Sequence, residues 1–173
     1  WKTYEYKNFL FVPDIGLNTE EELNILNLEE ISNTQNPFLL GWPHYEGTID
    51  NEIKFNEIFL YQNGVAESIN SFVKENLILP KVFYTHEAPE NFRAAIIGGG
   101  VIENKESKYY EHYLFADYLS NEFFVYDFNK DELFIIPLGD VNSFITSVTI
   151  HPRKIDTVLF TTRSGDLIEI KLP

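Results

Sequence analysis

The chain of 173 residues is strongly acidic, with 27 Asp and Glu against 13 Lys and Arg and a formal net charge of −14. Such a surface repels phosphate backbones and anionic lipids, which excludes nucleic acids and anionic membranes as expected partners. The absence of Cys excludes disulfides, thiolate metal sites and thiol nucleophiles, and no apolar run approaches the roughly 20 residues of a membrane span. Because the chain contains no Met, we expect a processed chain or a piece of a longer protein.

The first half of the chain combines strand-like runs with one helix-like segment. An aromatic and aliphatic run from Lys7 to Val12 stops at Pro13, and residues 21–26 alternate weakly. Apolar residues recur at helical spacing over about residues 65–76, and Pro80 follows shortly after. We therefore expect a short amphipathic helix inserted between strands, either packed on the surface or serving as a lid or partner contact.

The second half has the pattern of antiparallel hairpins. Three strand-like runs follow one another over residues 112–119, 122–129 and 132–138, separated by polar two-residue breaks. Residues 157–162 and 166–172 form a further pair across a turn that contains Gly. Short antiparallel strands joined by tight turns are typical of a sandwich, a barrel or a propeller, and periodicity alone does not choose among these.

Three consecutive glycines, Gly98 to Gly100, lie between apolar residues. Their setting indicates a strand that another part of the backbone approaches closely. A phosphate-binding glycine loop would need a helix directly after it, and the pattern indicates none.

Four stretches carry motifs in a fixed order. They are D-x-G-x-N-x-x-E-E-x-N followed by G-W-P-x-x-E-G within residues 14–47, I-G-G-G-V-I at 97–102, Y-x-F-x-D-Y at 113–118, and G-D-L-I-E-I at 165–170. Together they resemble the glucose/sorbosone dehydrogenase family of six-bladed β-propeller quinoproteins. The resemblance implies an all-β fold, in which residues 1–173 form a single partial domain of roughly the C-terminal three blades, since a blade takes about 40–50 residues.

The resemblance also implies a function. Members of the family oxidise a sugar or alcohol hydroxyl by hydride transfer to pyrroloquinoline quinone, with calcium, and are periplasmic or secreted. Their general base is a His of the earlier blades, so it would lie upstream of Trp1 and no catalytic residue is expected in this segment. The four histidines present, His44, His86, His112 and His151, are expected to be packed or exposed.

Two calcium sites follow from the resemblance. In the first, the main-chain carbonyls of Gly16 and Leu17 would hold the ion that polarises the quinone, and calcium accepts such oxygens readily. In the second, Glu46, Thr48 and Asp50 would bind a structural calcium. The alternatives are a tight turn capped by its own polar side chains at the first position and a solvated loop at the second.

The chain departs from the family at the cations that pair with the quinone carboxylates. The matching positions lie near Leu119, Phe144 and Thr146, none of them basic, and Glu103 stands where the family has an Arg. Arg93 is the nearby cation that could compensate as a cofactor ligand. A non-catalytic propeller that binds a protein or glycan partner, as the Hedgehog-interacting protein does, is therefore the alternative function.

The acidic run Glu20-Glu21-Glu22 is expected to be a charge cluster at a strand edge. Paired catalytic carboxylates would have to converge in space, which the sequence does not show.

Overall fold

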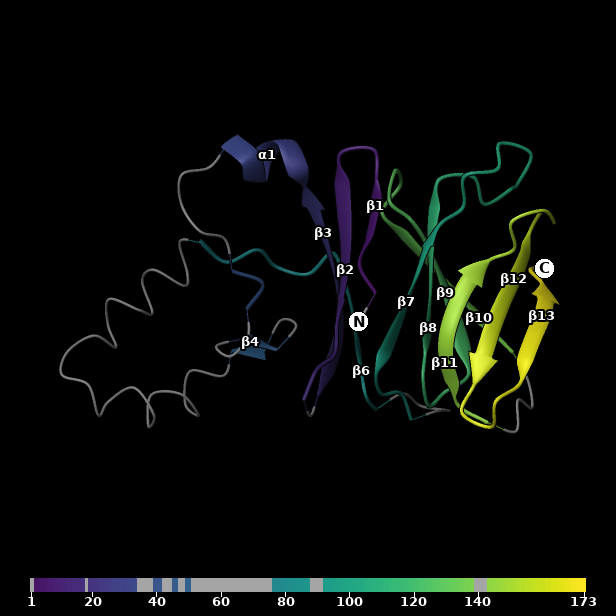
Figure 1. Cartoon of the computed structure of the whole chain (residues 1–173). Coiled ribbons are helices and arrows are strands. Elements are labelled where there is room, and N and C mark those ends of the chain that lie inside the picture. Colours follow the sequence, from purple (N-terminus) through teal and green to yellow (C-terminus); the bar gives the residue numbers. More distant parts are fainter. Residues whose placement is uncertain are drawn as a thin grey trace.

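The structure, a computed structural model, describes residues 2–17, 19–33, 39–41, 45–46, 49–50, 76–87, 92–138 and 143–173. Three antiparallel sheets stand side by side (Figure 1). The first contains β1 (Tyr4–Tyr6), β2 (Phe9–Asp14), β3 (Glu20–Asn27) and β6 (Val82–Thr85); the second contains β7 (Ile96–Val101), β8 (His112–Asp117), β9 (Glu122–Asp127) and β10 (Glu132–Pro137); the third contains β11 (Ile145–Ile150), β12 (Thr157–Thr162) and β13 (Leu167–Lys171).

Each of these sheets is a meander whose strands pair in chain order. The first strands of the three sheets meet: β7 contacts both β1 and β11. Gly98 and Gly100 allow the first of these contacts, because a Cβ on Gly98 would lie 2.5 Å from the Lys2 carbonyl oxygen and one on Gly100 would lie 2.9 Å from the Tyr4 ring. This is the close backbone approach that the glycine run predicts, and the arrangement is that of successive propeller blades.

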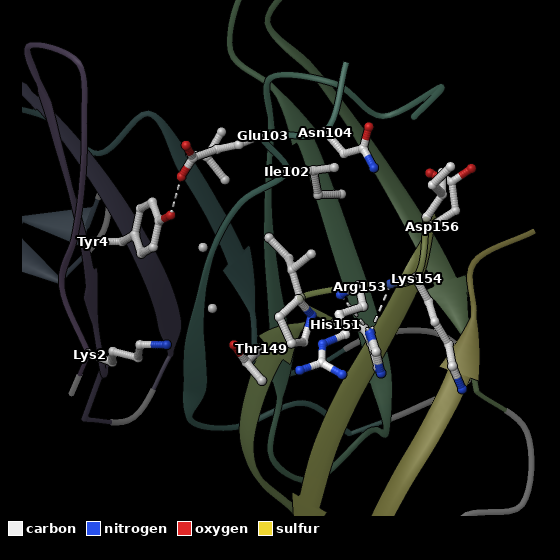
Figure 2. Close-up of a pocket in the computed structure, with 16 residues that line it drawn as sticks. Lys2, Tyr4, Ile102, Glu103, Asn104, Thr149, His151, Arg153, Lys154 and Asp156 are labelled. Carbon is white, nitrogen blue, oxygen red and sulfur yellow. Dashed lines mark hydrogen bonds between the residues drawn. The ribbon is translucent and has the colours of Figure 1, made fainter. Parts of the chain in front are cut away.

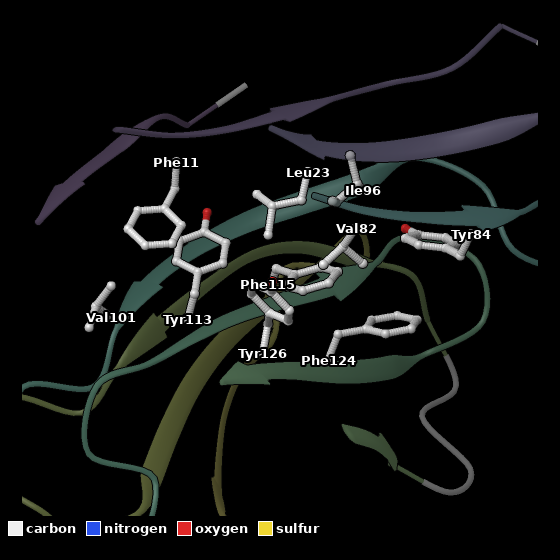
Figure 3. Close-up of a cluster of buried hydrophobic side chains, with 10 residues drawn as sticks. All are labelled: Phe11, Leu23, Val82, Tyr84, Ile96, Val101, Tyr113, Phe115, Phe124 and Tyr126. Carbon is white, nitrogen blue, oxygen red and sulfur yellow. The ribbon is translucent and has the colours of Figure 1, made fainter. Parts of the chain in front are cut away.

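Strands β7, β8 and β9 of the middle sheet are buried on both faces, whereas its edge strand β10 is largely exposed. Strand alternation explains the burial. Along β9, Phe124 and Tyr126 point into a cluster shared with the first sheet, whereas Phe123 and Val125 point into a cluster shared with the third. Stacked rings dominate the first cluster (Figure 3), for example Phe124 on Phe115 with centroids 4.9 Å apart. Each fully buried Phe contributes about 1.5–3 kcal/mol of transfer free energy.

The hairpins of the second half lie where the sequence predicts them. Asn121, Asp131 and Gly165 lie in the turns before β9, β10 and β13 and have positive φ angles of 56°, 60° and 92°, respectively. The N-terminal run is shifted relative to the expected strand from Lys7 to Val12. Lys7, with φ 53°, lies in the turn between β1 and β2, so the strand begins at Phe9 and continues through Pro13 to Asp14.

Two smaller elements complete the described part of the chain. Helix α1 (Leu28–Asn33) follows β3 directly, and the side chain of Asn27 caps it by accepting the Glu29 N–H at 3.0 Å. Strands β4 (Tyr45–Glu46) and β5 (Ile49–Asp50) form a two-stranded sheet. The predicted helix over 65–76 lies, but for its last position, outside the described residues.

Within the described ranges, no helix has the length and apolar character needed to cross a membrane.

Candidate functional site

The loops that follow β2, β6, β8 and β12 gather at one end of the sheets, the lower end in Figure 1. Main-chain hydrogen bonds join them: His86 N–H donates to the Thr19 carbonyl at 2.9 Å, and Tyr118 N–H donates to the Ala95 carbonyl at 3.0 Å. The rings of Tyr118 and Phe144 lie 4.9 Å apart and extend the contact to the third sheet. We call this region the loop end.

A buried carboxylate organises the loop end. Glu21 on β3 is fully buried, and its Oε1 accepts the Ala95 N–H at 2.8 Å while its Oε2 accepts the Ile96 N–H at 3.0 Å. His86 Nε2 lies 2.8 Å from the same Oε1. Ala95 has φ 70°, a strained conformation for a residue with a side chain, and Glu21 holds it there.

The prediction that Glu20, Glu21 and Glu22 form a charge cluster at a strand edge is therefore wrong. All three are buried, because β3 lies inside its sheet between β2 and β6.

A second buried carboxylate, Asp117, ends β8. Its Oδ1 accepts the N–H groups of Leu119 at 2.9 Å, Ser120 at 2.8 Å and Ala94 at 3.3 Å, and its Oδ2 accepts the Tyr84 hydroxyl at 3.0 Å. Burial raises the pKa of Asp117 above its usual value, although these hydrogen bonds oppose the shift. Burial also raises the pKa of the Tyr84 hydroxyl, and the neighbouring Asp117 charge adds to the increase. Asp117 is fully buried, so it fixes loops and does not face a ligand.

Arg93 is held by the second sheet. Its Nε and Nη2 donate to the two carboxylate oxygens of Glu122 at 2.6 and 3.1 Å, and its guanidinium lies 5.6 Å from the Phe124 ring centroid. The hydrogen bond to Glu122 raises the pKa of Arg93 further. The cation that sequence analysis singles out for a cofactor is thus engaged with a carboxylate and a ring.

The two predicted calcium loops meet at the loop end. Glu46 is buried, and its Oε1 accepts the N–H of Thr19 at 2.7 Å and that of Glu20 at 3.2 Å. Gly16 makes room for this contact, since a Cβ there would lie 2.8 Å from Glu46 Oε1 and 1.7 Å from the Glu20 carbonyl oxygen. Gly16 and Glu46, expected in separate sites, therefore form one unit, which we call the loop clamp.

The other predicted ligands are placed only in part. Leu17 is 63% exposed, so the turn faces solvent. Thr48 and the side chain of Asp50 lie outside the described residues. Sequence reasoning missed Glu21, Tyr84 and Asp117 as organisers of the region, and no local signal identifies them, because their partners lie far along the chain.

From the described residues, no donor reaches the main-chain oxygens of Gly16 or Leu17, and Glu46 Oε1 lies close to Gly16. The same residues contain no group of three or more His, Cys, Asp or Glu side chains that could hold a metal ion, so a cation here would depend on main-chain oxygens. A tricarboxylate needs cations, and Arg93, the cation expected to serve it, is engaged with Glu122, so the described residues around Arg93 do not fit the quinone.

Comparison with known proteins shows the fold. No family model matches the chain, and no curated protein matches it. Among solved structures it is similar to the PQQ-bound form of an aldose sugar dehydrogenase from Streptomyces coelicolor, with 14% identity and a TM-score of 0.54. The match covers 96% of this chain and 41% of that one, so the chain spans less than half of that protein. The predicted all-β propeller-type fold is confirmed, while membership of the family stays a prediction.

Proposed function

We propose that this chain is part of a β-propeller dehydrogenase that oxidises a hydroxyl group of a sugar or polyol, with calcium at the loop end. The loop clamp is the observation that carries the proposal. Glu46 closes the turn after β2 and leaves the carbonyl oxygens of Gly16 and Leu17 without donors from the described residues. The shared fold with a PQQ-bound sugar dehydrogenase supports this assignment, as does the acidity of the chain, which favours a cation.

Calcium held by Gly16 and Leu17 would supply a Lewis acid. What the chain itself supplies is a rigid frame, in which Glu21 and Asp117 fix the loops around the clamp. We assign no quinone contact and no proton transfer to the described residues. His86, the histidine at the loop end, is buried against Glu21 and is not assigned as the base. A periplasmic or secreted location forms part of the same proposal.

Calcium titration of the 173-residue chain by calorimetry tests the clamp. We expect binding that Gly16→Ala weakens by at least tenfold, because the added Cβ overlaps the Glu20 carbonyl and shifts the turn. Glu5→Gln on the exposed face of β1 is the matched control and should bind calcium as the parent chain does. Calcium binding that Gly16→Ala leaves unchanged would refute the site. Quinone titration and dye reduction with aldoses, on the protein from the whole reading frame, then test the oxidation.

A non-catalytic propeller that binds a protein or glycan is the second candidate. The Arg93–Glu122 ion pair favours it, because this pair removes a cation that a quinone would need. The two candidates differ in the quinone titration: the dehydrogenase requires saturable binding, and the binding propeller requires none while retaining affinity for a glycan or protein.

A further inference from the structure

A second cavity lies away from the loop clamp. It has a volume of about 340 Å³ and is bordered by β1, by β7 and the loop after it, and by the end of β11 and the turn that follows (Figure 2). Gly99 and Gly100 form part of its wall, where β7 carries no side chains. Glu103 and Asp156 also line it, past the C-terminal end of β7. Ala95, at the loop end, precedes the other end of this strand.

Two cations face each other across this cavity. Lys2 and Arg153 extend toward one another from opposite walls, with Thr149 between them (Figure 2). In the described part of the chain, neither side chain forms an ion pair, whereas Lys7 and Lys154 each bind a carboxylate. The chain as a whole is acidic, with a net charge of −14, so two cations without acidic partners on one cavity stand out.

The two acidic residues that line the cavity each accept a hydrogen bond from a hydroxyl group. Glu103 Oε1 accepts the Tyr4 hydroxyl at 2.7 Å, and Asp156 accepts the hydroxyl of Ser107. Burial, with the adjacent Glu103, raises the pKa of Tyr4 to about 12, so Tyr4 remains a donor to Glu103 at neutral pH. These contacts fix the two carboxylates, which line the cavity and keep their charge, while Lys2 and Arg153 have no ion-pair partner among the described residues.

The turn that carries Arg153 is fixed. His151 Nδ1 accepts the N–H groups of Arg153 at 3.0 Å and Lys154 at 2.9 Å, which sets the direction in which the Arg153 side chain leaves the backbone. On the opposite wall, the Lys2 carbonyl packs against Gly98, which fixes the backbone there.

We propose that this cavity binds a small polyol that carries a carboxylate or phosphate group, with the anion between Lys2 and Arg153 and the Thr149 hydroxyl as a further donor. Bidentate Arg and a Lys point charge are the usual partners of both anions. The volume is at the lower end of the range for small-molecule sites, about 300–1,000 Å³, and suits a ligand of monosaccharide size. The site does not depend on the proposed function, since it shares no residue with the loop clamp.

Three compounds with the same six-carbon chain separate the possible ligands: glucose, its acid gluconate, and glucose 6-phosphate. Each is titrated into the 173-residue chain while amide chemical shifts are followed by NMR. We expect the anions to bind with about millimolar affinity and to shift the amides of Gly99, Gly100 and Thr149, while glucose does not bind. Tighter binding of the phosphate or of the carboxylate identifies the anion that the cavity prefers.

Two Arg variants provide the matched comparison. Arg153→Gln removes one of the two cavity cations without an ion pair in the described part of the chain and leaves Lys2, whereas Arg163→Gln removes an exposed Arg in the turn after β12, at the loop end. We expect the first to weaken binding by about tenfold or more and the second to leave it unchanged, with both variants folded by far-UV circular dichroism. Equal weakening by the two, equal binding of glucose, or shifts confined to the loop end would overturn the proposal. Lys2→Gln is the independent variant if Arg153→Gln fails to fold.

Discussion

Removal of the Glu21 carboxylate should strongly destabilise the fold. Glu21→Ala leaves the N–H groups of Ala95 and Ile96 without their acceptor in a fully buried place, and also deprives His86 of its partner. An unsatisfied buried group costs about 1–3 kcal/mol, so the loss should be about 3–5 kcal/mol. Since domains of this size are stable by about 5–15 kcal/mol, the effect is a large fraction of the total.

Glu21→Gln is the finer test of the same idea. Its amide offers one acceptor oxygen where the carboxylate offers two, so one of the two N–H groups, of Ala95 or of Ile96, must face an NH₂. We expect a loss of about 1–3 kcal/mol, smaller than for the Ala variant. Urea unfolding followed by far-UV circular dichroism measures both losses; at about 2 kcal/mol per molar, the Ala variant should shift the midpoint by about 2 M.

Hydrogen exchange supplies a local readout, because the Ala95 and Ile96 amides should lose protection relative to those of β8. Glu5→Gln, on the exposed face of β1, is the control and should remain within about 0.5 kcal/mol of the parent. If both Glu21 variants also remain within that margin, Glu21 does not hold the loop end together.

Three further perturbations test other parts of the site. Gly16→Ala should cost about 1–3 kcal/mol, because the added Cβ would overlap the Glu20 carbonyl oxygen and crowd Glu46; urea unfolding measures the cost, and an unchanged midpoint contradicts it. Arg93→Leu should cost about 3–5 kcal/mol by leaving buried Glu122 without its guanidinium, and Arg93→Leu/Glu122→Leu should regain most of it; a double variant as unstable as the single argues against the pair. Burial raises the pKa of Asp117, so the native state binds this proton more tightly than the unfolded chain does. Its contribution to stability is therefore full below the ordinary carboxyl pKa of 3.8 and is lost as the pH rises through the raised native value. Asp117→Asn should remove this slope from unfolding measured across that window, and an unaltered slope would assign it to other groups.

The strands of the second half could be predicted because their determinants are local. Each hairpin there has apolar runs on both sides of a short polar turn, and Asn121 and Asp131 tolerate the positive φ that these turns need. The turn at Lys7 and Asn8 has a polar two-residue break of the same kind, so its determinant is also local. The expected strand starts two residues too early because it includes this break.

The candidate site was less predictable, because its contacts join distant parts of the chain. The sequence singles out Gly16 and Glu46 but does not show that they touch, since β3 and the following segment separate them. Glu21 belongs to an acidic triplet whose composition indicates a surface, and its partners at Ala95 and Ile96 lie more than 70 positions later. Burial of a carboxylate depends on those partners, so it appears only once the sheets are assembled.

The contact between β1 and β7 sets how closely two neighbouring sheets approach. Gly98 and Gly100 let these sheets touch through backbone atoms and a ring face, with no side chain of β7 between them. A side chain at either glycine would meet the Lys2 carbonyl oxygen or the Tyr4 ring and would push β1 and β7 apart. The spacing of the two sheets is therefore encoded in part by residues that have no side chain.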